Sequence, residues 1–191
     1  MKEISKTLLS QLSARESFAF SSVEGGIPRG SLISVSGSAG SGKTEVILNF
    51  LAENPKLKVA WVEERFTIYP CAFLQARVNL DRVLFVNADH DAKKALWVVH
   101  QILKSQIFEV VILSTGSAAS LDAVTLRRLQ ISAEKANATL IFLSDFSSLT
   151  GAWSIPLQIQ VSRSLESQNP ILHIIKSRGQ KVCQTPLRQK A

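Results

Sequence analysis

Residues 31–44 read SLISVSGSAGSGKT and contain a complete GxxxxGK[ST] phosphate-binding loop at residues 37–44. The residues before the loop are apolar and β-prone, and residues 44–53 after it have the apolar spacing of a helix. A strand, a glycine-rich turn and a helix in this order let successive backbone N–H groups surround a phosphate, and the helix dipole adds its positive end. The stretch therefore predicts a nucleoside triphosphate site.

Two side chains of the loop have defined tasks in such a site. Lys43 would reach the β- and γ-phosphates, and the Thr44 hydroxyl would bind Mg²⁺. A glycine-rich turn that binds nothing is the alternative, but the full motif between a strand and a helix argues against it. The predicted nucleotide-binding residues are Gly37, Ser38, Ala39, Gly40, Ser41, Gly42, Lys43 and Thr44.

Apolar strand-like runs alternate with helical patterns on both sides of the loop. The predicted strands are 31–36, 59–62, 83–86, 110–113 and 139–143, and the predicted helices are 44–53, 71–76, 91–105 and 121–136. Strands that are apolar throughout and separated by helices indicate a parallel sheet covered on both faces. Residues 157–161 and 171–175 alternate apolar and polar, which predicts an antiparallel pair at the C-terminal edge. The predicted fold class is α/β, a mostly parallel central sheet flanked by helices.

The length of 191 residues suits a single domain. We divide the chain into an N-terminal helical segment (1–20), a core (21–180) and a basic C-terminal tail (181–191). One side of the first segment carries Ile4, Leu8, Leu9 and Leu12. This apolar stripe packs on its own domain or docks on a neighbouring subunit or partner, and the sequence leaves both open.

Composition excludes several classes of protein. A hydrophobic fraction of 46% excludes intrinsic disorder, and two distant cysteines exclude a disulfide scaffold. The sequence has no apolar run long enough for a membrane span and no signal-peptide pattern. We therefore expect a soluble cytoplasmic protein without a membrane partner.

A triphosphate site normally has a carboxylate at the end of a neighbouring strand, which holds Mg²⁺ or its waters. Here the strand 110–113 is followed by Ser114 and Thr115. Glu63 and Glu64 end the strand 59–62 and are the candidate catalytic carboxylates, although a solvated strand end would explain them equally well. The sequence thus predicts nucleotide binding and leaves hydrolysis open.

Residues 25–145 resemble the RecA recombinase core of the P-loop ATPase superfamily. The resemblance is carried by GGIPRG at 25–30 before the phosphate loop, VAWVEE at 59–64 and FEVVIL at 108–113. It implies a RecA-like domain that binds ATP with Mg²⁺ and acts on DNA in repair or damage tolerance. It also implies that the chain can form a homo-oligomer.

Shorter stretches are similar to the ImuA proteins, RecA-like accessory factors of bacterial mutagenic translesion synthesis. They are ALW at 95–97, LRRLQ at 126–130 and IIKSRG at 174–179. This similarity implies an accessory role in an SOS-type response, with RecA or a translesion polymerase as a partner.

The departures from RecA fall on positions that serve catalysis in that family. Arg65 aligns with the RecA glutamate that activates the attacking water, and Ser114 aligns with the aspartate that ends RecA's fourth strand. Ser144 and Asp145 replace a polar pair whose glutamine couples nucleotide state to DNA binding. The resemblance therefore implies weak or absent ATP hydrolysis.

Positive charge is concentrated near the C-terminus. The net charge is +7, and residues 176–191 contain five basic and no acidic residues. Such a segment can neutralise phosphates without reading sequence, although a solvated tail is the commoner state of terminal segments. Lys176, Arg178 and Lys181 are the predicted DNA-binding residues, with single-stranded DNA as the first candidate.

The sequence contains three tryptophans, of which one is a candidate for binding. Trp153 follows the fifth strand and could stack on a base or fill the core beneath its loop. Trp61 and Trp97 lie in apolar patterns and are predicted to be core residues.

Three functions are compatible with these features. The first is a RecA-like accessory protein that binds ATP and hydrolyses it slowly or not at all. The second is a compact DNA-dependent ATPase that uses Glu63 or Glu64. The third is an interaction scaffold whose phosphate loop is a relic.

Overall fold

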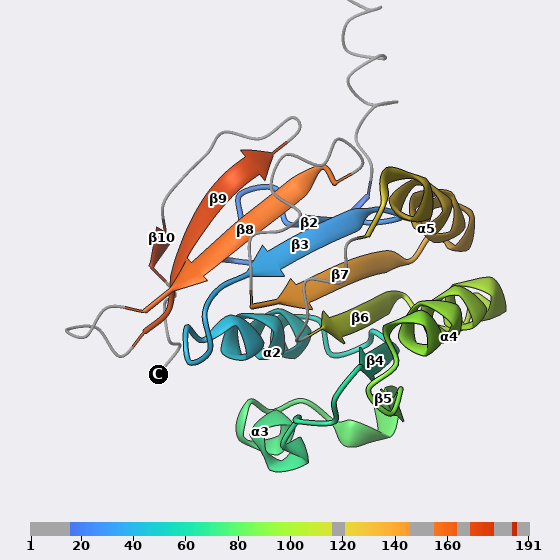
Figure 1. The fold of residues 1–191 in the computed structure, drawn as a ribbon. Coiled ribbons are helices and arrows are strands. Elements are labelled where there is room, and N and C mark those ends of the chain that lie inside the picture. The colour runs from blue at the N-terminus through green and yellow to red at the C-terminus, as the bar shows by residue number, and fades with distance from the viewer. Residues whose placement is uncertain (1–15, 116–120, 146–154, 164–168, 178–184, 187–191) are drawn as a thin grey trace, which may run out of the picture.

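The computed structural model describes residues 16–115, 121–145, 155–163, 169–177 and 185–186. An eight-stranded sheet forms its centre, in the order β10-β9-β8-β3-β7-β6-β4-β5 (Figure 1). The strands are β3 (Leu32–Ser36), β4 (Val59–Glu63), β5 (Val83–Asn87), β6 (Val110–Thr115), β7 (Thr139–Ser144), β8 (Leu157–Ser162), β9 (Ile171–Ser177) and β10 (Thr185–Pro186). The helices are α2 (Lys43–Glu53), α3 (Pro70–Gln75), α4 (Ala92–Ser105) and α5 (Ala123–Ala136), with the 3₁₀ turn η1 (Leu80–Arg82). A separate antiparallel pair is formed by β1 (Ser17–Phe18) and β2 (Ile27–Pro28).

The sheet confirms the predicted α/β class and its mostly parallel strands. β3 pairs in parallel with both β7 and β8, and β4, β5, β6 and β7 continue the parallel arrangement. β9 runs antiparallel to β8, as predicted for these two segments, and β10 extends this edge. β3 therefore lies inside the sheet, and the loop that follows it opens at the carboxyl ends of its neighbours, where open α/β sheets bind ligands.

The two faces of the sheet bury separate hydrophobic clusters. On one face Ile33, Trp61 and Ile141 pack with Phe50 of α2 and Phe73 of α3. On the other face, alternate residues of the same strands pack against α4 and α5; they include Leu32, Val62, Leu113, Leu140, Ala95, Val99, Leu126 and Leu129. Because side chains of a strand alternate between faces, strands that are apolar throughout fill both clusters.

The prediction that Trp97 is a core residue is wrong, whereas Trp61 is fully buried as predicted. Trp97 is 62% exposed on α4. Trp97 lies two positions after the buried Ala95 and two positions before the buried Val99. Residues two positions apart in a helix differ by about 200° around its axis. The apolar side chain at position 97 therefore points away from the sheet.

Arg82 fixes the C-terminal end of the helix that follows the phosphate loop. Its guanidinium donates hydrogen bonds to the carbonyl oxygens of Leu51 (2.7 Å), Asn54 (3.0 Å) and Leu57 (2.8 Å). The last carbonyls of a helix have no partner within the helix, so a cation at this end satisfies them and opposes the helix dipole. Burial lowers the pKa of Arg82 from its ordinary value.

Several predicted features lie outside the described residues. They are residues 1–15, Trp153, Arg178 and Lys181, together with the basic residues Arg188 and Lys190. Across the part of the chain that is described, no helix has the length and apolar character that crossing a membrane requires.

Candidate nucleotide-binding site

The phosphate loop joins β3 to α2 through a turn that leaves the start of the helix open. Gly40 and Gly42 have positive φ angles of 78° and 90°, which glycine adopts without strain. Gly42 occupies the N-cap of α2, and no side chain caps the first turn. The backbone N–H groups of this turn are therefore available to an anion, as the sequence motif requires.

Two glycines of the loop are also required by their surroundings. A Cβ atom at Gly37 would collide with the carbonyl oxygen of Val161. A Cβ at Gly42 would lie 2.8 Å from Nη2 of Arg163 and 2.8 Å from Cβ of Pro170. Val161, Arg163 and Pro170 thus pack closely on the loop, and a larger residue at either glycine would displace them.

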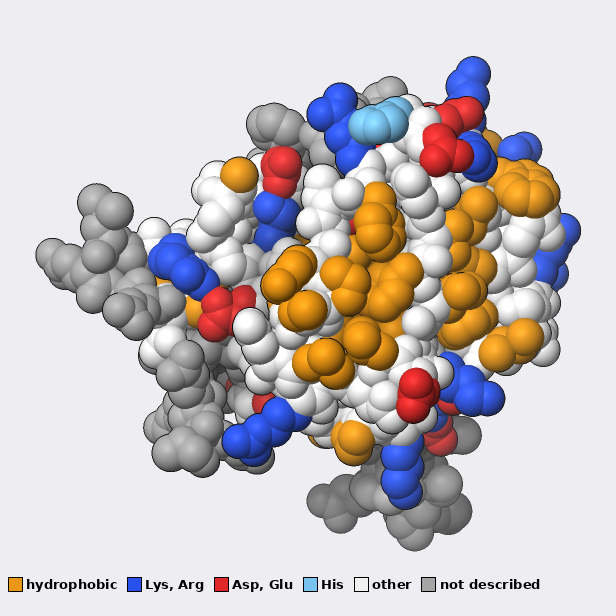
Figure 2. All heavy atoms as spheres, turned by 90° about the horizontal axis from the view of Figure 1, so that it is seen from below, with side chains coloured by type: hydrophobic (Ala, Val, Ile, Leu, Met, Phe, Trp, Pro, Cys, Tyr) orange, Lys and Arg blue, Asp and Glu red, His pale blue; other side chains and the backbone are white. Residues whose placement is uncertain are grey.

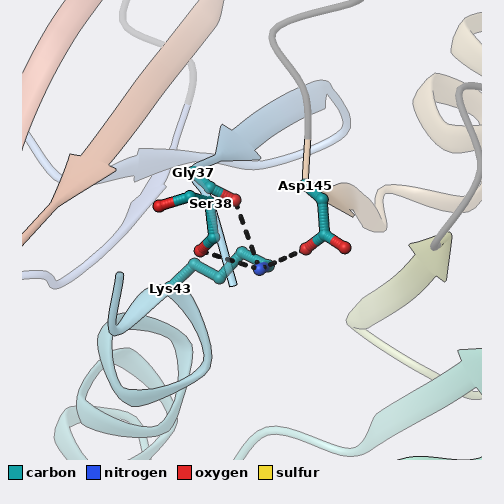
Figure 3. Close-up of polar contacts among 4 residues, drawn as sticks. All are labelled: Gly37, Ser38, Lys43 and Asp145. Carbon is teal, nitrogen blue, oxygen red and sulfur yellow. Dashed lines mark hydrogen bonds and ion pairs between the residues drawn. The ribbon is translucent and has the colours of Figure 1, made fainter. Parts of the chain in front are cut away.

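Lys43 points across the loop toward the end of β7 (Figure 3). Its Nζ donates to the carbonyl oxygens of Gly37 (3.3 Å) and Ser38 (3.4 Å) and to Oδ1 of Asp145 (2.5 Å). A lysine ammonium has three donors, so these contacts use all of them. Protein groups thus hold the lysine on both sides of the loop mouth.

A cavity of about 580 Å³ lies in front of Lys43 and Thr44. It is also lined by both predicted carboxylates, Glu63 and Glu64, and by Ser114. The sheet register explains this meeting, since Glu63 pairs with Ser114, and Thr115 pairs with Ser144 just before Asp145. The carboxyl ends of β4, β6 and β7 thus face the phosphate loop across one space.

Glu63 is buried, and its carboxylate accepts three hydrogen bonds. Oε1 accepts from Nε1 of Trp61 (3.1 Å), and Oε2 accepts from the backbone N–H groups of Thr67 (2.6 Å) and Ile68 (3.0 Å). These contacts hold the turn that follows β4. A catalytic role for Glu63 stays a prediction, and in this geometry its oxygens are engaged in positioning the cavity wall.

Glu64 and Arg65 follow on the same turn and line the cavity. Two backbone hydrogen bonds fix Glu64. Its N–H donates to the Ser114 carbonyl (3.1 Å), and its carbonyl accepts from the backbone N–H of His90 (2.7 Å). Its side chain is half-buried, whereas Arg65 is exposed. The three hydrogen bonds that hold this turn are accepted by the carboxylate of Glu63 and not by that of Glu64.

Asp145 belongs to the site but was not among the predicted site residues. It follows β7 directly, lines the cavity and contacts Lys43. The signal in the sequence was a carboxylate immediately after a buried strand. Assigning Asp145 to the site from this signal requires the strand order as well. β7 is the neighbour of β3 in the sheet, although 102 residues separate Lys43 from Asp145 in the sequence.

The donors around the cavity fit a magnesium ion bound with a nucleotide. Thr44 offers a hydroxyl, and Glu64 and Asp145 offer carboxylates, the oxygen ligands that Mg²⁺ prefers. Among the described residues no group of three or more His, Cys, Asp or Glu side chains forms a metal site. The ion would therefore take one or two ligands from the protein and the others from the phosphates and water, as is usual for Mg²⁺ with nucleotides.

The predicted DNA-binding residues are separate from this cavity. Lys176 is half-buried on β9, where it pairs in register with Gln158 of β8, and it is not among the residues that line the cavity. Arg178 and Lys181 lie outside the described residues. A role of these three residues in DNA binding stays a prediction.

Residues 7–124 match the RecA N-terminal domain family, and this match covers more than half of the chain. The chain belongs to the RecA family. The predicted resemblance to the RecA core is thereby confirmed. The finer similarity to the ImuA proteins stays a prediction.

Curated RecA proteins match over part of their length. RecA of Caulobacter vibrioides (strain NA1000 / CB15N) is 28% identical over 141 residues, which cover 63% of this chain and 39% of that protein. RecA of Clostridium perfringens (strain 13 / Type A) is 26% identical over 148 residues, 66% of this chain and 42% of that protein. The chain thus spans about two fifths of these RecA proteins.

A solved structure resembles the fold as a whole. The crystal structure of the RadB recombinase superposes with a TM-score of 0.69 at 20% sequence identity, covering 83% of this chain and 86% of that one. This likeness supports the RecA-like arrangement of the sheet and helices around the phosphate loop.

Proposed function

We propose that this RecA-family chain binds ATP with Mg²⁺ and acts in DNA repair and damage tolerance, with weak or absent ATP hydrolysis. The observation that carries the proposal is the contrast within one cavity. The phosphate loop is complete in sequence and geometry, whereas β6 opposite it ends in Ser114 and Thr115 rather than in a carboxylate.

In this proposal the protein binds nucleotide through its loop. Backbone N–H groups at the start of α2 surround the phosphates, Lys43 contacts the β- and γ-phosphates, and the Thr44 hydroxyl binds Mg²⁺. ATP is preferred over GTP on the ground of family membership. The ion polarises the phosphates and neutralises their charge when it is bound.

Slow hydrolysis follows from what surrounds the γ-phosphate position. A serine carries no charge to hold Mg²⁺ or its waters, and Arg65 has no lone pair with which to activate water. The Glu63 carboxylate already accepts three hydrogen bonds. Of the two predicted catalytic residues, Glu64 is therefore the candidate for any residual ATP hydrolysis.

The proposed partners are DNA and repair proteins. RecA family membership and the net charge of +7 both favour a polyanionic partner. Lys176, Arg178 and Lys181 are the proposed contacts, with single-stranded DNA as the first substrate to test. Similarity to the ImuA proteins supports an accessory role in SOS-type translesion synthesis beside RecA or a translesion polymerase, within the cytoplasm.

Self-association is proposed through the sheet edge at β5. Among the described strands none pairs with the outer side of β5, and apolar side chains gather on this part of the surface (Figure 2). Leu84 of β5 is 43% exposed, and Phe66, Tyr69 and Leu74 nearby are more exposed still. An edge strand with apolar side chains readily takes up another chain.

Sedimentation velocity, which measures the oligomeric state, tests this surface by comparing the wild type with a single variant. Leu84→Glu is expected to shift the protein toward the monomer, because a carboxylate at an apolar contact must be desolvated. Val124→Glu, on the exposed side of α5, is the control at a similarly exposed apolar residue. If Leu84→Glu sediments like the wild type at every concentration, β5 is not the contact.

A second candidate function is a DNA-dependent ATPase, favoured by the position of Glu64 on the cavity wall. Phosphate release with and without single-stranded DNA separates the two functions. DNA-stimulated release that is lost in Glu64→Gln would support the ATPase. Unchanged thermal stability on addition of Mg²⁺-ATP would argue for a scaffold, because ATP at about 100 times its dissociation constant adds roughly 2.7 kcal/mol.

A further inference from the structure

The Asp145 carboxylate forms an ion pair with the Lys43 ammonium. The two side chains are 2.5 Å apart at Oδ1 and Nζ, and Lys43 is only 14% exposed (Figure 3). The exposure of Asp145 is 39%, so one side of its carboxylate still faces the cavity. Asp145 is therefore both bound to the loop lysine and open to the space where a nucleotide would bind.

The sheet places Asp145 next to the position where a charge is missing. Ser144, the residue before it, pairs with Ser36 of β3 on one side and with Thr115 of β6 on the other. Neighbouring strands are about 4.8 Å apart. A carboxylate that follows β7 is therefore displaced by one strand from the end of β6, toward the phosphate loop.

The other two carboxylates of the cavity are less suitable for an ion bound at Thr44. Both follow or end β4, which is separated from β3 by β6 and β7, whereas β7 is the direct neighbour of β3. Glu63 in addition accepts hydrogen bonds from Trp61, Thr67 and Ile68. Asp145 contacts the phosphate loop through its ion pair with Lys43.

A bound triphosphate would change the partners of this carboxylate. Lys43 has three donors and three protein acceptors, so it can reach a phosphate only by giving up at least one of them. If Asp145 is released, it faces a phosphate of the same charge, and the repulsion is relieved only by a cation between them. A carboxylate oxygen and phosphate oxygens are together suitable ligands for Mg²⁺.

We infer that Asp145, the carboxylate paired with Lys43, faces the Mg²⁺ ion, directly or through its water, once Mg²⁺-ATP is bound. It thereby supplies a metal-facing charge that Ser114 does not, and the proposed slow hydrolysis then rests on Arg65 and on the engaged Glu63 carboxylate. The inference rests on the proposed ATP binding, and it assigns Asp145 as a positioning residue for the ion.

The test compares ATP affinity with Mg²⁺ and with EDTA in the wild type and in Asp145→Asn, by calorimetric titration. In the wild type Mg²⁺ is expected to tighten ATP binding, since it neutralises charge between the phosphates and Asp145. In Asp145→Asn the gain from Mg²⁺ is expected to shrink by about tenfold, because the neutral amide is a poor Mg²⁺ ligand. ATP without Mg²⁺ is expected to bind more tightly to Asp145→Asn than to the wild type, because the carboxylate no longer holds Lys43.

Two further variants control for structure. Asp145→Glu keeps the charge and is expected to retain most of the Mg²⁺ gain. Ser114→Ala removes the hydroxyl of the neighbouring strand end and is expected to leave the gain unchanged. Equal thermal midpoints of the four proteins without nucleotide show that the differences are not due to unfolding.

Each outcome separates the inference from the proposed function. If Asp145→Asn tightens ATP binding by the same factor with and without Mg²⁺, Asp145 only blocks Lys43 and the metal role is wrong. If Ser114→Ala loses the Mg²⁺ gain and Asp145→Asn keeps it, the ion is held at β6. If the wild type binds no ATP in either buffer, the proposed function and the inference both fail.

Discussion

The two walls of the nucleotide cavity are built in different ways. One wall is the phosphate loop, residues 37–44, which comes from a single continuous stretch between β3 and α2. The other is the strand-end wall, formed by Glu63, Glu64, Ser114 and Asp145 from three strands. The loop has the complete set of residues for phosphate binding, whereas the strand-end wall has its carboxylates at unusual places. The difference supports the proposal that this site binds nucleotide more readily than it hydrolyses it.

The largest expected effect comes from breaking the phosphate loop. Lys43→Ala is expected to weaken Mg²⁺-ATP binding by about 100-fold or more, because a partly buried charged contact to the phosphates is lost. Calorimetric titration measures it. Lys94→Ala is the matched control, since Lys94 also pairs with an aspartate, Asp89 at 2.5 Å, but on the exposed part of α4. Equal ATP affinity of Lys43→Ala and the wild type would contradict nucleotide binding by the loop.

The same difference between the walls decides what could be predicted from the sequence. The loop, its lysine and the flanking strand and helix are contiguous, so motif and periodicity were sufficient to identify them. The inner strands β3, β4, β6 and β7 were found because they are rich in apolar residues, being buried on both faces. β8 and β9 were found from their alternation of apolar and polar residues. Asp145 was missed as a site residue because its contact with Lys43 depends on strand order, which local patterns do not contain. Trp97 was misplaced because its apolar character was read without its angle around α4.

The second prediction concerns the strand-end wall and separates Glu63 from Glu64. Glu63→Gln is expected to lower the free energy of unfolding by about 1–3 kcal/mol, because the amide group turns a donor toward buried N–H groups that now bond to a carboxylate. Glu64→Gln is expected to cost less stability, because Glu64 is half-buried. Urea unfolding of the two variants measures the difference. A larger loss of unfolding free energy in Glu64→Gln than in Glu63→Gln would show that Glu64, and not Glu63, stabilises the turn after β4.

The smallest effect is expected away from both walls, at the start of α5. The Asp122 side chain accepts a hydrogen bond from the Thr125 N–H (2.8 Å). Hydrogen bonding with the side chain of Thr125, and then with its backbone, lowers the pKa of Asp122 from its ordinary value. A lowered folded pKa means that the stabilisation is present above the unfolded value, about 3.9, and is lost as pH falls through the folded pKa. Asp122→Ala is therefore expected to lower the thermal midpoint slightly at pH 7 and to show less further loss than the wild type on acidification below pH 4.

Ligand binding provides the control for this last variant. Because Asp122 caps a helix that packs on the opposite face of the sheet from α2, Asp122→Ala is expected to bind Mg²⁺-ATP like the wild type. A loss of ATP affinity in this variant would mean that the phosphate loop is coupled to α5, and the distinction between the two walls would have to include that helix.

The central claim is that an intact phosphate loop faces a wall that is poor in catalytic groups. The most direct measurement is Mg²⁺-ATP binding by titration together with phosphate release, each with and without single-stranded DNA. We predict saturable ATP binding that requires Lys43, with phosphate release close to background in both conditions. Rapid DNA-stimulated release, or the absence of ATP binding, would contradict the claim.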